Sequence, residues 1–170
     1  SCMIGKEGEG WKVAMTTLTF ERGAVGGQAG GLSMMDLSIN DIVELAKRAK
    51  RNGRPAIEDP HVRGQLVDLI TESRSNALMN ARSSVPALAS DWPTSVAMSG
   101  KLRSSELKRS MCQFAISLQG ANGARYVSRE AVDGGMWQRS YLNAFSGTIG
   151  GGTSQIQHNI IGERVLGLPK

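Results

Sequence analysis

Apolar residues along this chain recur at spacings of three and four, the pattern of α-helices that bury one face. Between residues 120 and 135 the chain reads as turn and loop, without a strand pattern of useful length. The predicted helices cover about residues 7–31, 38–53, 59–81, 91–118, 136–145 and the segment after residue 152. The expected fold is all-α, an up-and-down helical bundle in which residues 1–170 form one domain.

Polar residues and prolines mark the boundaries of these helices. Ser38, three residues before Asp41, predicts a capping box at the start of the second helix, and Asn52-Gly53 predicts its end. Asp59-Pro60 and Asp91-Trp92-Pro93 each place an N-cap before a proline in the first turn. Val85-Pro86 separates the two long helices that these signals begin.

The first helix is apolar on more than one face, which predicts a buried, central helix. One seam of it, spaced 3, 4, 3 and 4, contains a single carboxylate, that of Glu21; its members are Trp11, Ala14, Leu18, Glu21 and Val25. A buried carboxylate is costly unless it is paired, protonated or functional. Two alternatives stay open: Glu21 at the edge of the seam, or Glu21 in a salt bridge with Arg22 or another neighbour.

The C-terminal region opens with a glycine run at residues 150–152, followed by Thr153 and Ser154. Glycines permit a positive φ and close approach of the backbone to a ligand. Thr153 or Ser154 can cap the final helix and leave its first N–H groups for an anionic or polar ligand. A stripe of Ile156, Ile160 and Val165 is expected to bury this helix.

Composition narrows the class of protein. Of 170 residues, 40% are hydrophobic but only 5% are aromatic, which favours aliphatic helix packing over a β-sandwich. Two cysteines are too few for a disulfide framework, so a reducing compartment is expected. No apolar run reaches the roughly 18 residues of a membrane helix. The first residue is Ser1 rather than Met, which suggests a cleaved or truncated product.

The net charge is +5, and the densest basic stretch, around the end of the predicted second helix, consists of Lys47, Arg48, Lys50, Arg51 and Arg54. Such a run can meet the phosphates of a nucleic acid or of coenzyme A. It is also typical of a solvated helix C-terminus, where cations favour the helix dipole, and charge runs are weak motifs. Nucleic acid is therefore an unlikely partner.

Other motifs of known chemistry are not met. The glycine run is not followed by a lysine, so it is not a phosphate-binding P-loop. His61, His158 and two distant cysteines lack the spacing of metal ligands, so no metal is expected.

Three segments resemble the acyl-CoA dehydrogenase family. The segment Gly152-Thr153-Ser154-Gln155-Ile156-Gln157 resembles its C-terminal signature, and Ile4 to Met15 resembles the passage from its β-domain into its C-terminal helical domain. Gln119 to Gly123 resembles its glycine-rich turn. The resemblance covers about the whole chain but only the C-terminal half of such an enzyme. The family's N-terminal helical domain and β-domain have no counterpart among these 170 residues.

The resemblance implies roles for five residues. Most family members carry the catalytic base directly before the Gly-Thr of the signature, where this chain has Gly151. Isovaleryl-CoA and long-chain members carry it on the first helix of this domain, directly before an arginine, and here that pair is Glu21 and Arg22. This paired exchange implies that Glu21 is the general base, with Arg22 and Gly151 beside the substrate. Thr153 and Gln155 match positions that contact FAD.

The family also implies a reaction and partners. An acyl-CoA is oxidised to its trans-2-enoyl-CoA, electrons pass to an electron-transferring flavoprotein, and C-terminal domains form the core of a homotetramer or homodimer. Localisation would be cytoplasmic, or the mitochondrial matrix in a eukaryote. One departure favours a non-catalytic assembly module or a subunit with an incomplete flavin site: Asn52 stands where the family has an aromatic residue that reaches FAD across a subunit interface. The isolated chain is expected to be inactive, to bind FAD weakly at best and to self-associate.

Overall fold

The computed structural model describes residues 3–26, 37–83, 85 and 93–169. Helices account for most of them, and a single two-stranded hairpin lies among them. In chain order the elements are α1 (Gly10–Gly26), α2 (Ile39–Arg48), β1 (Lys50–Arg51), β2 (Arg54–Pro55), the 3-10 helix η1 (Ala56–Glu58), α3 (Pro60–Ser83), α5 (Pro93–Leu118), the 3-10 helices η2 (Gly120–Ala124) and η3 (Val132–Gly135), α6 (Met136–Ile149) and α7 (Ser154–Arg164).

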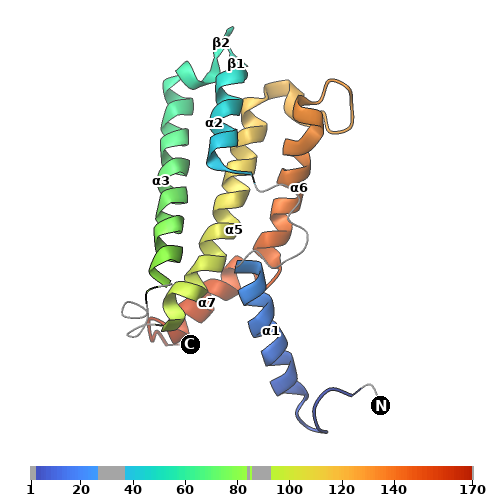
Figure 1. Cartoon of the computed structure of the whole chain (residues 1–170), viewed down its shortest axis with the longest axis vertical. Coiled ribbons are helices and arrows are strands. Elements are labelled where there is room, and N and C mark those ends of the chain that lie inside the picture. Colours follow the sequence, from blue (N-terminus) through green and yellow to red (C-terminus); the bar gives the residue numbers. More distant parts are fainter. Residues whose placement is uncertain (1–2, 27–36, 84, 86–92, 170) are drawn as a thin grey trace.

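Helices α2, α3, α5 and α6 run alternately up and down beside one another (Figure 1). Helix α5 is the central member, because it contacts α1, α2, α3, α6 and α7. The hairpin closes one end of the bundle, and α7 and α1 lie toward the other (Figure 1). The predicted all-α up-and-down bundle is confirmed. Within the described residues, no helix is long and apolar enough to cross a membrane.

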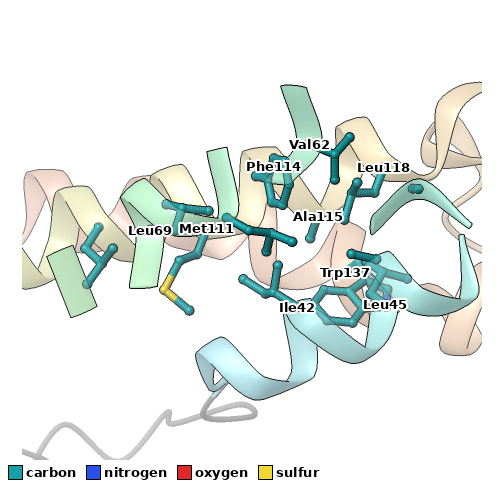
Figure 2. Close-up of a cluster of buried hydrophobic side chains, with 13 residues drawn as sticks. Ile42, Leu45, Val62, Leu69, Met111, Phe114, Ala115, Leu118 and Trp137 are labelled. Atoms are coloured by element: carbon teal, nitrogen blue, oxygen red, sulfur yellow. The ribbon is translucent and has the colours of Figure 1, made fainter. Parts of the chain in front are cut away.

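The hydrophobic core joins α2, α3, α5 and α6 (Figure 2). Ile42 and Leu45 come from α2, Val62 and Leu69 from α3, Met111, Phe114, Ala115 and Leu118 from α5, and Trp137 from α6. Burying a large aliphatic or aromatic side chain contributes about 1.5–3 kcal/mol, so this cluster is the main force that holds α2, α3 and α6 against α5.

Most predicted helix boundaries are confirmed. The Ser38 side chain accepts a hydrogen bond from the Asp41 N–H, and the Asp41 carboxylate accepts one from the Ser38 N–H at 2.7 Å, which completes the capping box. The Asp59 carboxylate accepts from the His61 N–H at 2.8 Å at the start of α3. Asp91 and Trp92 lie outside the described residues, but α5 begins at Pro93 as expected.

The end of the second helix was predicted too late. Helix α2 stops at Arg48, and the residues that follow form the β1–β2 hairpin, in which Arg51 pairs with Arg54. Asn52 and Gly53 have φ values of 52° and 80°, as a tight two-residue hairpin turn requires. Asn-Gly is a strong signal for a hairpin turn, but from the sequence it was interpreted only as the end of a helix.

The prediction of a buried, central first helix is wrong for this chain. Helix α1 packs against α5, but its N-terminal end points away from the bundle (Figure 1). Trp11 is 78% exposed, and Ala14 and Leu18 are exposed with it. These apolar side chains have no partner surface among the described residues. The predicted extension from residue 27 to 31 lies outside those residues.

The last two helices differ in detail from the prediction. Helix α6 continues to Ile149, four residues beyond Phe145. In α7 the expected buried stripe is wrong at Ile156, which is 47% exposed, and the buried side chain is the neighbouring Gln157. An amide is buried there because it has a backbone partner in the preceding turn, which is described next.

Candidate functional site

The turn between α6 and α7 has the conformational freedom that its glycines predicted. Gly150 caps α6 with φ −60°, and Gly151 and Gly152 follow with φ values of 67° and 103°. Side chains other than glycine rarely adopt such values. A Cβ atom on Gly152 would lie 2.7 Å from Nε2 of Gln157, so space as well as φ requires glycine there.

Two buried side chains hold this turn from the inside. Gln157 Nε2 donates to the carbonyl of Gly151 at 2.8 Å, and Lys101 Nζ donates to the carbonyl of Gly152 at 2.5 Å. Gln157 is 2% exposed and Lys101 is 3% exposed. Neither role was predicted from the sequence. A signal for Lys101 exists, because it lies fourteen residues, or about four helical turns, before the buried Ala115 on α5.

Thr153, rather than Ser154, caps the final helix. Its Oγ1 accepts a hydrogen bond from the Ile156 N–H at 3.3 Å, and Ser154 is the first residue of α7. Gln155 is exposed on the first turn of α7. The two residues predicted to contact a cofactor therefore both lie at the N-terminus of this helix.

Peptide planarity sets the direction of two N–H groups in this turn. The C=O and N–H of a trans peptide point in opposite directions. Because the Gly151 and Gly152 carbonyls face buried donors, the N–H groups of Gly152 and Thr153 face away from the core. Within the described part of the chain, neither N–H has a hydrogen-bond acceptor.

Glu21 and Arg22 lie in α1, but their side chains are outside what the structure describes. Helix α1 packs against α5, which also carries Lys101 and contacts α7. The structure therefore brings the helix of Glu21 and the helix of Thr153 to one neighbour. Their side chains are not placed relative to each other, so the assignment of Glu21 as base stays a prediction.

The basic stretch lies at the opposite end of the bundle and is largely neutralised by ion pairs. Lys47 Nζ lies 2.6 Å from a Glu44 oxygen, and Arg51 Nε lies 3.3 Å from an Asp59 oxygen. The Arg48 guanidinium donates to both Asp133 oxygens, at 3.0 and 2.9 Å. This bidentate contact lowers the pKa of Asp133 and raises that of Arg48. These pairs fit the interpretation of a solvated helix end.

Two open pockets flank the hairpin at this end, and Lys50 and Leu118 line both. The predicted glycine-rich turn forms η2, which lies between α5 and α6 in the chain. Gln138 Nε2 donates to Gln119 Oε1 at 2.9 Å and to the Gly123 carbonyl at 3.1 Å, which fixes this turn from inside. Asn52 is exposed at the tip of the hairpin. Among the described residues, no group of three His, Cys, Asp or Glu could hold a metal.

Comparisons with known proteins agree with this architecture. A family model described as acyl-CoA dehydrogenase, C-terminal domain, matches residues 8–166. Acyl-CoA dehydrogenase IpdE1 of Mycobacterium tuberculosis is 36% identical, over 99% of this chain and 40% of the relative. Mitochondrial isovaleryl-CoA dehydrogenase of Arabidopsis thaliana is 28% identical, over 96% of this chain and 38% of the relative.

Solved structures share the fold. A chain in the crystal structure of the ChsE4-ChsE5 complex from Mycobacterium tuberculosis matches with a TM-score of 0.71 and 26% identity, over 98% of this chain and 42% of that chain. This chain thus spans about two-fifths of the length of these relatives.

Proposed function

This chain belongs to the acyl-CoA dehydrogenase family, and from that membership we propose that it is the C-terminal domain of a flavin-dependent acyl-CoA dehydrogenase. The reaction is the α,β-oxidation of an acyl-CoA thioester to the trans-2-enoyl-CoA. One observation supports the proposal: in the turn at residues 150–153, Thr153 caps the following helix, and two buried side chains, those of Lys101 and Gln157, donate hydrogen bonds to its carbonyls.

The residues at this turn fit a flavin. Thr153 and Gln155 would hold it, since one offers a backbone N–H beside its capping hydroxyl and the other an exposed amide. The exposed side chain of Ile156 adds apolar surface next to these donors. A planar, partly polar ring system is typically bound by a few placed donors within apolar surroundings. When bound, FAD supplies the acceptor for the hydride.

Glu21 removes the α-proton of the acyl-CoA in this proposal. The backbone of Gly151 supports that assignment, because φ 67° favours glycine over the glutamate that most family members carry there. Arg22, next to Glu21, and Gly151 lie beside the thioester. Trp11 and Leu18, on the seam of Glu21, would keep water from the carboxylate once the remainder of the enzyme covers them.

The test is Glu21→Gln in the full-length enzyme. The exchange preserves side-chain shape and removes only the proton acceptor. We expect turnover to fall by about 10² to 10⁴ or more, with FAD and acyl-CoA binding retained. Stopped-flow reduction of the flavin by an acyl-CoA measures the rate. Glu7→Gln, an exposed carboxylate just before α1, is the matched control and should keep full activity. Near-normal turnover in Glu21→Gln would rule out Glu21 as the base.

Electrons would leave through an electron-transferring flavoprotein, and the enzyme would act as a homodimer or homotetramer, in the cytoplasm or a mitochondrial matrix. These partners follow from the family. A reduced-flavin reoxidation assay with and without such a flavoprotein tests the first of them.

A second candidate is a subunit that contributes to assembly and holds an incomplete flavin site. The observation that favours it is Asn52: the family's aromatic flavin contact is replaced by a hairpin-turn residue with φ 52°. The stoichiometry of FAD in the purified full-length protein separates the two. One flavin per chain supports the enzyme with an equivalent site in every subunit, whereas substoichiometric FAD that rises on addition of a second, different subunit supports the alternative.

A further inference from the structure

We infer that Lys101 is a positioning residue for the flavin-binding turn: by holding the Gly152 carbonyl, it aims the backbone N–H group of Thr153 at the ligand. This inference rests on the proposed function. It concerns a residue on α5, 51 positions before Gly152 and outside the C-terminal segment at residues 152–157.

Burying a lysine at position 101 costs free energy. An ammonium group loses its hydration on burial, so lysines are almost never fully buried without partners. Lys101 is 3% exposed, and its Nζ lies 2.5 Å from the Gly152 oxygen. Methionine or leucine would fill the same space without that penalty. The donor itself is therefore what the position requires.

The two buried donors belong to different helices. Gln157 belongs to α7, the helix that the turn opens, and holds Gly151 at 2.8 Å. Lys101 belongs to α5, the central helix of the bundle, and holds Gly152. Gln157 holds the turn to the start of α7. Lys101 holds it directly to α5, the helix against which α1 also packs.

The hydrogen bond from Lys101 to Gly152 affects the ligand contact through a single peptide group. The Gly152 carbonyl and the Thr153 N–H belong to one planar peptide, so rotation of the carbonyl away from α5 turns the N–H by the same angle. Gly152 has φ 103° and no side chain to resist such a rotation. Without Lys101, the peptide is free to turn while the helices stay folded. Loss of the lysine should therefore impair ligand contact more than stability.

The experiment compares Lys101→Met, Lys101→Arg and the control Lys108→Met, which removes a partly buried lysine one heptad later on the same helix. Two readouts are used. The residual dipolar coupling of the Thr153 N–H, which reports the orientation of that bond relative to the bundle, is measured by NMR on the 170-residue chain. FAD dissociation constant and visible flavin spectrum are measured on the full-length enzyme.

For Lys101→Met we expect a changed residual dipolar coupling at the Thr153 N–H, a shifted flavin spectrum and FAD binding weaker by roughly tenfold to a hundredfold, the loss of one charge-assisted hydrogen bond. Lys101→Arg, which keeps a donor, should restore most of the affinity, and Lys108→Met should change none of the three. If Lys101→Met does not fold, Lys101→Gln replaces it and should give an intermediate affinity.

An unchanged dipolar coupling and FAD affinity in Lys101→Met would overturn the positioning role, as would an equal loss of affinity in Lys108→Met. Failure of the unsubstituted full-length protein to bind FAD would instead contradict the proposed function. In that case the dipolar coupling of the Thr153 N–H still decides whether Lys101 orients the turn.

Discussion

At the scale of single residues, Asp133 ties two helices together through one carboxylate. It accepts two hydrogen bonds from Arg48 at the end of α2 and one, at 2.7 Å, from the indole N–H of Trp137 in α6. Asp133 has φ 48°, a conformation that Asp and Asn tolerate better than other residues. The hydrogen bonds from Arg48, and then the one from Trp137, lower the pKa of this carboxyl group.

Asp133→Asn should therefore destabilise the bundle in a pH-dependent way. Asparagine retains the shape and the φ preference, so the variant isolates the charge. A lowered pKa in the folded state means stabilisation that is complete above the unfolded pKa of about 3.9 and lost as pH falls through the folded value. We expect a loss of about 1–2 kcal/mol at neutral pH, moderated by solvent screening of Arg48, and convergence with the unsubstituted chain at acid pH.

Urea denaturation at neutral and at acid pH measures the difference in unfolding free energy. Glu130→Gln is the matched control, since its side chain is 71% exposed and pairs with Arg125 at the surface. It should cost less than about 0.5 kcal/mol at either pH. An Asp133→Asn deficit that persisted unchanged at acid pH would show that charge is not its source.

Single residues were predictable where a local rule governs them and not where a distant partner does. Thr153 as a cap and the positive φ at the glycine run follow from neighbouring residues alone. Gln157 was not recognised, because a helical stripe favours the isoleucine next to it. Only the Gly151 carbonyl, which turns inward, makes the amide the buried side chain.

At the scale of elements, the entry into α6 depends on two successive glycines that differ in their surroundings. Gly134 and Gly135 have φ values of 64° and 79°. A Cβ on Gly134 would meet no atom within 4 Å, whereas one on Gly135 would overlap the backbone carbonyl of Tyr126. The first position requires only a conformation, and the second requires space as well.

Alanine at the two positions should accordingly have unequal effects. Gly134→Ala should cost about 1–2 kcal/mol, the strain of a left-handed backbone. Gly135→Ala should cost about 3 kcal/mol or more, because the loop around Tyr126 must also move away from α6. Thermal unfolding of the two variants gives the comparison directly. Equal melting temperatures would mean that the loop yields freely and that contact with Tyr126 does not limit this turn.

Helix boundaries followed the sequence wherever a capping residue or proline set them, as at Ser38, Asp59 and Pro93. The boundary at Arg48 did not, because Asn52-Gly53 fits both a helix end and a hairpin turn. The pairing of Arg51 with Arg54 is what decides between them. Helix propensity near residue 49 carries no information on whether the chain turns back on itself.

At the scale of the whole molecule, the bundle leaves much apolar surface uncovered, and it does so on the elements around the candidate site. The exposed large apolar side chains on α1, α6, α7 and the segment after α7 include Trp11, Leu142, Ile149, Ile156, Leu166 and Leu168. The first helix was predicted to be buried because it is apolar on more than one face. Apolarity predicts that a surface will be covered, but not whether this chain or another supplies the cover.

The 170-residue chain should therefore self-associate. Soluble monomers seldom expose contiguous apolar patches beyond a few hundred Å², and a symmetric pairing of copies covers the same patch on each. Sedimentation velocity at micromolar concentration should show a dimer or larger species. Trp11→Gln should shift the distribution toward monomer, because it removes the largest exposed apolar side chain of α1, whereas Val67→Gln, an exposed residue on α3, should leave it unchanged. A sharp monomer for the unsubstituted chain would show that its exposed apolar residues are too scattered to form an interface.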